Sequence, residues 1–167
     1  LMKNYQVSSV YIGGGTPSYI DEQWIAALME GVFDCFNVLP DAEISIECNP
    51  GTLSREKLLA YRDAGINRLS IGLQSANNDE LKLLGRIHTF EQFVTNYEVA
   101  RNVGFKNINV DLMYGLPGQS ASQYMATVNK IIRLHPDHIS AYSLIVEKGT
   151  PFYEKYKFDM VRQEAGM

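Results

Sequence analysis

Short runs of apolar, β-branched residues recur along the chain and predict five β-strands. Consecutive runs are too far apart to be joined as hairpins, so each pair needs a long crossover connection. The segments between them show the helical period of 3.6 residues in their apolar positions. The chain is therefore expected to alternate strand and helix. The predicted strands are residues 7–12, 43–47, 68–73, 108–113 and 139–144.

The clearest helical pattern lies between the first two predicted strands. Its apolar residues return on one side of a helix, and we predict that this side is buried. Cys35 falls within the same segment, and we expect it in the core because free cysteine behaves as a small apolar residue. The residues of this apolar stripe are Trp24, Ile25, Leu28, Met29, Val32, Phe33 and Phe36.

Local signals at helix ends support the alternation. Two Ser/Thr residues are followed three positions later by Gln, the spacing of a capping box, in which side chains and backbone N–H groups satisfy one another. Two further polar residues are candidate caps, and two glycines stand where helices end and strands follow. These residues are Thr89 with Gln92, Ser120 with Gln123, Asp21, Ser54, Gly65 and Gly104.

Strands that alternate with helices through long crossovers predict a parallel sheet covered by helices, so the fold class is α/β. A barrel and an open doubly wound sheet fit this pattern equally well, and both place ligands at the carboxyl ends of the strands. No linker-like segment divides the chain. We expect one core over residues 1–148, followed by residues 149–167 as a tail or as the start of a further region.

Composition and charge narrow the function classes. Apolar residues make up 46% of the 167 positions, which is enough for one sizeable core. No apolar run approaches the roughly 18 residues that a membrane-spanning helix requires. The net charge of −4 is spread along the chain without a basic block, which disfavours a nucleic-acid partner. We expect a cytoplasmic protein that does not bind nucleic acid.

A glycine-rich loop follows the first predicted strand. It runs from Gly13 through Gly14 and Gly15 to Thr16 and Pro17. Residues without a Cβ permit positive φ angles and let a ligand approach the backbone closely. The loop lacks the Gly-Lys-Ser/Thr of a P-loop and the spacing of a dinucleotide-binding fingerprint. It is either a ligand-binding loop of another kind or a tight turn before a helix.

Polar side chains stand at the ends of the later strands. Glu47 can accept hydrogen bonds from a ligand amine or hydroxyl, and the amide of Gln74 can donate and accept. Asp111 lies in an apolar strand and needs a partner there. Arg86, after a helix stop, can pair with a ligand carboxylate in bidentate fashion. We predict that Thr16, Glu47, Gln74 and Asp111 converge on one cavity.

The residues that bind metals in proteins are sparse. The two cysteines, Cys35 and Cys48, have no partner at the spacing of a metal or cluster site. His88 has no ligand-type neighbour, and His135 and His138 flank a predicted turn. We expect no metal site from this chain and no iron–sulfur cluster on it by itself. The sequence leaves the role of Cys48 open.

Six segments, taken in order, resemble the radical S-adenosylmethionine (SAM) family. Within it, they are similar to the branch that contains haem chaperones of the HemW type and oxygen-independent coproporphyrinogen III oxidases. The resemblance extends over residues 10–153, and the ordered set is far more specific than any one motif. The segments are GGGTP at 13–17, ECNPG at 47–51, RLSIGLQS at 68–75, LGRIH at 84–88, DLMYGLPGQ at 111–119 and HISAYSL at 138–144.

The resemblance implies a parallel-stranded (β/α)6 partial TIM barrel, incomplete here at its N-terminus, in which a [4Fe–4S] cluster binds SAM. The family's three-cysteine loop is absent from this chain, so the resemblance implies SAM and the cluster for the complete protein. It further implies SAM contacts for eight residues, the last of them a weaker position on the adenine side. These are Gly14, Gly15, Thr16, Glu47, Gln74, Arg86, Asp111 and Ile145.

Two functions in this branch compete. A haem chaperone binds haem and transfers it to acceptor proteins, whereas the oxidase uses SAM cleavage to decarboxylate the propionate side chains of coproporphyrinogen III. Residues 49–52 and 147–152 are more similar to the chaperones, so we predict a haem chaperone, with the oxidase as the alternative. A more remote alternative is a phosphate-binding barrel enzyme without SAM, in which the glycine loop forms an anion-binding nest.

Overall fold

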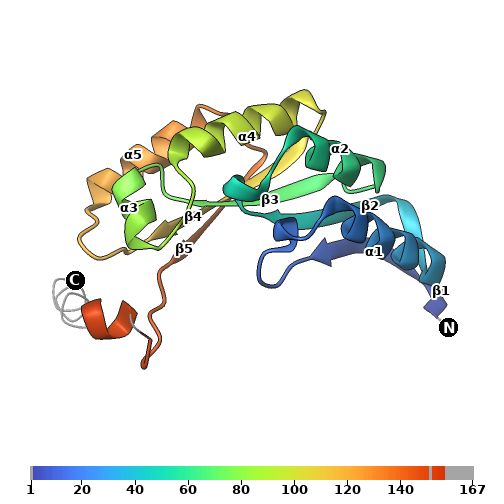
Figure 1. The fold of residues 1–167 in the computed structure, drawn as a ribbon, viewed down its shortest axis with the longest axis horizontal. Coiled ribbons are helices and arrows are strands. Elements are labelled where there is room, and N and C mark those ends of the chain that lie inside the picture. Colours follow the sequence, from blue (N-terminus) through green and yellow to red (C-terminus); the bar gives the residue numbers. More distant parts are fainter. Residues whose placement is uncertain (1, 151, 157–167) are drawn as a thin grey trace.

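The computed structural model describes residues 2–150 and 152–156, and these are organised around one parallel sheet (Figure 1). Its strands pair in the order in which they occur along the chain, and every neighbouring pair is parallel. The five strands predicted from the sequence are all present, some with longer bounds. They are β1 Met2–Ile12, β2 Phe36–Cys48, β3 Arg68–Gln74, β4 Asn107–Tyr114 and β5 His138–Ser143.

The arrangement of strands and helices distinguishes a barrel from a doubly wound sheet. A doubly wound sheet reverses its strand order and carries helices on both faces. Here the order does not reverse, and the long helices lie along one face (Figure 1). The sheet is therefore part of a barrel, as expected. The helices are α1 Glu22–Cys35, α2 Arg55–Asp63, α3 Asn78–Leu83, α4 Phe90–Asn102 and α5 Ala121–Ile132, with 3₁₀ turns η1 Pro17–Tyr19 and η2 Pro50–Thr52.

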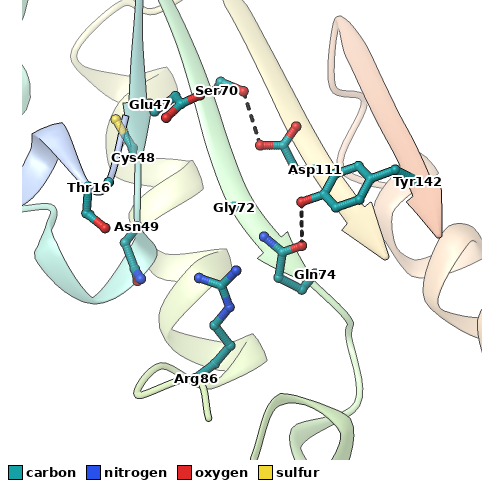
Figure 2. A pocket seen from close by; sticks show the side chains of 11 residues that line it. Thr16, Glu47, Cys48, Asn49, Ser70, Gly72, Gln74, Arg86, Asp111 and Tyr142 are labelled. Atoms are coloured by element: carbon teal, nitrogen blue, oxygen red, sulfur yellow. Dashed lines mark hydrogen bonds between the residues drawn. The ribbon is translucent and has the colours of Figure 1, made fainter. Parts of the chain in front are cut away.

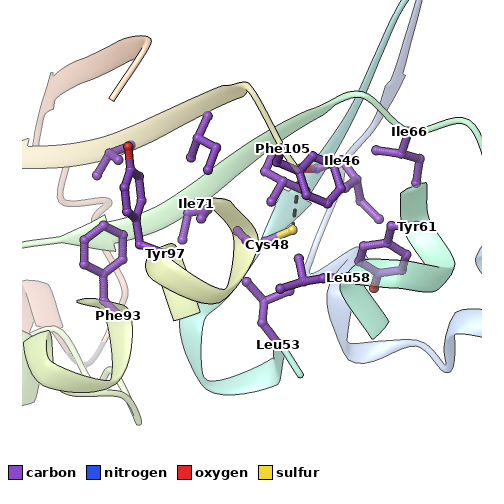
Figure 3. Packing of buried hydrophobic residues seen from close by; sticks show 14 of the residues in the cluster. Ile46, Cys48, Leu53, Leu58, Tyr61, Ile66, Ile71, Phe93, Tyr97 and Phe105 are labelled. Carbon is purple, nitrogen blue, oxygen red and sulfur yellow. Dashed lines mark hydrogen bonds between the residues drawn. The ribbon is translucent and has the colours of Figure 1, made fainter. Parts of the chain in front are cut away.

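Side chains alternate between the two faces of each strand, and this alternation places the core. In β2, Ile44, Ile46 and Cys48 are buried beneath the helices, while Ser45 and Glu47 point to the opposite, helix-free face. The strands β3 and β4 repeat this pattern, and their buried residues join aromatic side chains of α2 and α4 (Figure 3). The apolar residues that they contribute are Leu69, Ile71, Leu73, Ile108, Val110 and Leu112.

The helix-end signals hold with one exception. Both capping boxes form, with Thr89 and Ser120 as the capping residues. Ser54 accepts a hydrogen bond from the backbone N–H of Lys57 and caps α2. Asp21 occupies the cap position of α1, but its side chain makes no capping hydrogen bond. The two glycines predicted to end helices have positive φ angles, as a residue after a helix end often does.

The apolar stripe on α1 is buried over a narrower arc than predicted. Ile25 and Met29 are buried, whereas Trp24 is 64% exposed. The helix lies at one side of the sheet, where it packs against α2 and β2, so its outer side has no covering element among the described residues. Cys35 is exposed, and its predicted place in the core was wrong. The exposed residues of the stripe are Trp24, Leu28, Phe33 and Phe36. Phe36 belongs to β2, of which it is the first residue.

Two further expectations concern the whole chain. Among the described residues, no helix combines the length and apolar character needed to cross a membrane. The boundary expected at residue 149 stays a prediction, because residues 151 and 157–167 lie outside the described part of the chain.

The core assignment predicts a large loss of stability for Phe93→Ala. Phe93 is fully buried on α4 and its ring packs against those of Phe90 and Tyr97, so its removal should lower the free energy of unfolding by about 3–5 kcal/mol. Met125 on α5 is half exposed, and Met125→Ala should stay within about 0.5 kcal/mol. Urea denaturation measures both, and equal losses would contradict this assignment.

Candidate functional site

A cavity of about 180 Å³ opens on the helix-free face of the sheet, near the carboxyl ends of the strands (Figure 2). Parallel strands bring their carboxyl ends to one edge of a sheet, so residues far apart in sequence meet there. The lining includes six of the eight residues named from the sequence. The lining residues are Gly15, Thr16, Glu47, Cys48, Asn49, Ser70, Gly72, Gln74, Arg86, Asp111 and Tyr142.

Strand register decides which polar side chains are neighbours. The pairing of β2 with β3 sets Glu47 beside Ser70. The pairing of β3 with β4 sets Gly72 beside Asp111. These residues occupy the positions that alternate with the buried apolar residues, so they all project to the helix-free face. The cavity is thus a direct result of the alternation that also builds the core.

The glycine-rich loop forms one rim of the cavity. Gly14 and Gly15 have φ angles of 87° and 67°, which glycine adopts without strain. Gly13 is needed for space instead, since a Cβ there would lie 2.7 Å from the Tyr11 ring and 3.1 Å from the Glu47 carboxyl group. The Gly14 N–H donates to Glu47 Oε2 at 3.2 Å. The loop therefore contacts the end of β2 closely.

A buried serine fixes this loop to the segment after β2. The Ser18 hydroxyl accepts hydrogen bonds from the Asn49 N–H at 2.9 Å and from the Thr52 hydroxyl at 2.6 Å. The Ser18 carbonyl accepts from Lys57 Nζ at 2.8 Å. Because Asn49 and Thr52 belong to the 49–52 segment, that segment supports the glycine-rich loop from behind. Thr52 acts on the cavity through this support, whereas Asn49 also lines the cavity directly.

Glu47 is held by two donors. Besides the Gly14 N–H, the Tyr11 hydroxyl donates to Glu47 Oε1 at 2.8 Å. Burial, together with the hydrogen bond to Glu47 and its charge, raises the pKa of Tyr11 to about 12. Tyr11 therefore remains a protonated donor at neutral pH. Its hydrogen bond keeps the carboxylate of Glu47 at the cavity wall.

Asp111 has the partners that its position in an apolar strand required. Asn109 Nδ2 donates to Asp111 Oδ1 at 2.7 Å, and the Ser70 hydroxyl donates to Oδ2 at 3.2 Å. Burial raises the pKa of Asp111 above its usual value, while these two hydrogen bonds act in the opposite direction. Asp111 and Glu47 together give the cavity a wall of carboxylate oxygen acceptors.

The opposite wall carries hydrogen-bond donors. The Tyr142 hydroxyl donates to Gln74 Oε1 at 2.8 Å, and Gln74 Nε2 is turned toward the cavity (Figure 2). The Arg86 guanidinium also faces the cavity and forms no hydrogen bond or ion pair with any residue that the structure describes. The cavity is thus divided between acceptors and donors, which suits a ligand that carries a carboxylate and also donor groups.

The structure separates the residues named from the sequence into three groups. Thr16, Glu47, Gln74 and Asp111 meet in one cavity, as predicted, together with Gly15 and Arg86. Gly14 lies at its rim through the hydrogen bond to Glu47. Ile145 follows β5, is 81% exposed and is not among the lining residues. Its adenine-side position therefore stays a prediction.

Sequence reasoning missed several residues of this site. Ser70 and Asn109 are the polar members of alternating strands, so the two-residue period could have indicated them. Tyr11 and Tyr142 occupy equivalent alternating positions in the outer strands β1 and β5, but an aromatic residue in a strand is most often a packing residue. Nothing in the sequence marks their hydroxyl groups as donors to Glu47 and Gln74.

The two cysteines do not fit an iron–sulfur cluster. The thiol of Cys48 points into the core and donates to the Ile46 carbonyl at 3.7 Å (Figure 3). Burial raises the pKa of this thiol well above its usual range, which disfavours the thiolate that a cluster requires. Cys35 is exposed at the end of α1, and the length of β2 separates it from Cys48. The question left open by the sequence is answered, because Cys48 is a core residue.

Comparisons with known proteins agree on one family. The model of the radical SAM superfamily matches residues 1–131. The chain is 41% identical to the haem chaperone HemW of Bacillus subtilis (strain 168) over 148 residues, and 40% identical to that of Escherichia coli (strain K12) over 147 residues. Each alignment covers 88% of this chain and 39% of the relative.

A solved structure supports the same relationship. The coproporphyrinogen III oxidase HemN from Escherichia coli, described as a radical SAM enzyme, superposes with a TM-score of 0.80 at 30% sequence identity. The alignment covers 98% of this chain and 40% of that chain. The chain thus spans about two fifths of the length of the proteins to which it is similar.

The contact between Tyr11 and Glu47 predicts a pH titration. Replacing Glu47 by Gln removes the negative charge that disfavours the phenolate, so the pKa of Tyr11 should fall from about 12 toward the ordinary value of about 10. NMR titration of ¹³C-labelled tyrosine measures it, with Tyr11→Phe to assign the resonance. An unchanged pKa in Glu47→Gln would show that the two side chains do not interact.

Proposed function

The chain belongs to the radical SAM superfamily, and on this premise we propose that its cavity binds the methionyl and ribose parts of SAM. The division of the cavity into acceptors and donors carries the proposal. In this proposal the SAM carboxylate pairs with the donors Arg86 and Gln74 Nε2. The SAM amine or a ribose hydroxyl donates to the acceptor Glu47. Asp111 lines the same cavity and is proposed to contact the same ligand. SAM supplies the 5′-deoxyadenosyl group for radical chemistry.

Hydrogen bonds within the chain hold the two carboxylates of the cavity in place before a ligand binds. Tyr11 and the Gly14 N–H hold Glu47, and Asn109 and Ser70 hold Asp111. These bonds are made in advance, so less side-chain freedom is lost when a ligand binds. The [4Fe–4S] cluster belongs to the complete protein in this proposal, because neither cysteine of this chain fits it.

For the complete protein we propose a haem chaperone that binds haem and passes it to acceptor proteins. Two observations support this choice over an oxidase. Identity to the HemW proteins of Bacillus subtilis and Escherichia coli is 41% and 40% across most of the chain, compared with 30% to HemN. The 49–52 segment, similar to the chaperones, holds the glycine-rich loop and contributes only Asn49 to the cavity lining, so it can differ between related proteins without replacing a lining carboxylate. A cytoplasmic location without nucleic-acid partners is part of this proposal.

Coproporphyrinogen III oxidase is the second candidate. It is favoured by the superposition with HemN over 98% of the chain. Both candidates share the SAM cavity, so the cavity does not discriminate between them. The phosphate-binding barrel enzyme loses its support, because it assumed a chain outside the radical SAM superfamily.

Replacing Glu47 by Ala should weaken SAM binding by about 5- to 150-fold. The variant removes a preorganised acceptor and leaves ligand donors without a partner, a loss of about 1–3 kcal/mol. Glu43→Ala is the matched control, because Glu43 lies on the same strand and face but outside the cavity lining. Isothermal titration calorimetry of the anaerobically reconstituted complete protein measures both. Equal affinities for Glu47→Ala and wild type would contradict the assignment.

The choice between the two candidate functions is tested on the same complete protein. Supplied with haem, it should bind haem tightly and transfer it to an apo-acceptor. Supplied with coproporphyrinogen III, it should release no carbon dioxide at an enzymatic rate. Absorbance spectroscopy follows the haem, and product analysis follows decarboxylation. Enzymatic decarboxylation would overturn the chaperone proposal in favour of the oxidase, with the SAM site intact.

A further inference from the structure

We infer that Tyr142 is a positioning residue for the SAM site: its hydroxyl orients the Gln74 amide so that Nε2 donates to the ligand carboxylate. This inference rests on the proposed function and deepens it, because it names the residue that makes Gln74 present a hydrogen-bond donor to the cavity. It depends on three features of the structure, which are the hydrogen bond from Tyr142, the space above Gly72 and the backbone conformation at Gln74.

The hydrogen bond fixes which end of the amide faces the cavity. Tyr142 donates to Gln74 Oε1 at 2.8 Å, which leaves Nε2 as the free end. In the reverse orientation Nε2 would donate to the phenol oxygen, and Oε1 would face the cavity as an acceptor. The observed orientation satisfies the proton and turns a donor toward the cavity (Figure 2).

Gln74 is itself buried, so its amide has few ways to compensate for a lost partner. The residue is 3% exposed, and Nε2 makes no hydrogen bond to any residue that the structure describes. This amide nitrogen borders the cavity and is free to donate to a ligand there. Arg86 faces the same space and is also without a partner in the described part of the chain. Both donors therefore point to one anionic group.

The main chain and a glycine hold the amide where Tyr142 can reach it. Gln74 has a φ of 75°, a left-handed conformation that is uncommon for residues other than glycine. The preceding carbonyl, of Leu73, accepts a hydrogen bond from Nε2 of the buried His88 at 3.2 Å. The side chain folds back over Gly72, where a Cβ would lie 3.0 Å from Gln74 Nε2. The three constraints aim the side chain at Tyr142.

Burial supports the same roles. It lowers the pKa of His88, so the ring is neutral and its Nε2–H donates to the Leu73 carbonyl. It raises the pKa of Tyr142, so the phenol keeps the proton that it donates. The orientation of Gln74 therefore does not change near neutral pH.

A double-mutant cycle tests whether Tyr142 acts through Gln74. SAM affinity is measured by calorimetry on the anaerobically reconstituted complete protein carrying Tyr142→Phe, Gln74→Ala or both. Loss of one neutral hydrogen bond should weaken binding about three- to tenfold in Tyr142→Phe. In the Gln74→Ala background the same change should alter affinity less than about twofold, because the amide that it orients is gone.

Controls separate positioning from a general effect on the fold. Tyr114→Phe makes the same chemical change at the end of the neighbouring strand, where the hydroxyl makes no hydrogen bond to a described residue, and it should leave affinity unchanged. Thermal unfolding of Tyr142→Phe should match wild type within a few degrees. If Gln74→Ala does not fold, Gln74→Gly replaces it, since glycine adopts a φ of 75° without strain.

One further variant tests whether the ligand needs a hydrogen-bond donor at position 74. Gln74→Glu keeps an acceptor for Tyr142 but replaces the donor by a carboxylate oxygen, so SAM affinity should fall further than in Gln74→Ala. Tighter binding by Gln74→Glu would show that a ligand donor faces this position, and it would overturn the inference.

The outcomes distinguish the inference from the proposed function. If wild type does not bind SAM, the proposed function fails and the inference fails with it. If wild type binds and Tyr142→Phe binds equally well, the hydroxyl does not position Gln74. If the loss persists undiminished in the Gln74→Ala background, Tyr142 contacts the ligand directly or acts by another route. Each of these last two results overturns the inference and leaves the SAM site standing.

Discussion

The two-residue alternation of side chains along parallel strands is the constraint on which this structure depends. It places Ile46 and Ile71 beneath the helices and, from adjacent positions of the same strands, places Glu47 and Ser70 on the opposite face. A shift of one residue in the pairing would bury the carboxylate and expose the core. The packing that stabilises the sheet therefore also fixes the positions of the polar groups.

The polar face is only partly satisfied by the protein itself. Asp111 and Glu47 accept hydrogen bonds from neighbouring strands and from the glycine-rich loop. The cationic group of Arg86 and the amide nitrogen of Gln74 have no such partners among the described residues. An anionic ligand group can satisfy both donors at once, and each charge-assisted bond is stronger than a neutral one. The unsatisfied groups thus indicate where a ligand gains its affinity.

Two tyrosines from the outer strands complete the cavity. Tyr11 of β1 reaches inward to Glu47, and Tyr142 of β5 reaches inward to Gln74. In each case burial raises the pKa of the phenol, so it remains a donor. The outer strands therefore supply the hydrogen bonds that orient residues of the inner strands β2 and β3. The geometry of the site therefore depends on the two outermost strands as well as on the strands that carry Glu47 and Gln74.

The sequence by itself determined the strands, most helix ends and the cavity residues Thr16, Glu47, Gln74 and Asp111, because period, caps and strand-end polarity are local properties. The strand–helix pattern left the barrel and the doubly wound sheet unresolved, since strand order is a long-range property, and only the family resemblance favoured the barrel. The sequence also placed Cys35 in the core, because periodicity shows which side of a helix is apolar but not what covers it. Tertiary structure showed the strand order directly, and it alone decided the place of Cys35 and the roles of both tyrosine hydroxyls, whose partners are 36 and 68 residues away in sequence.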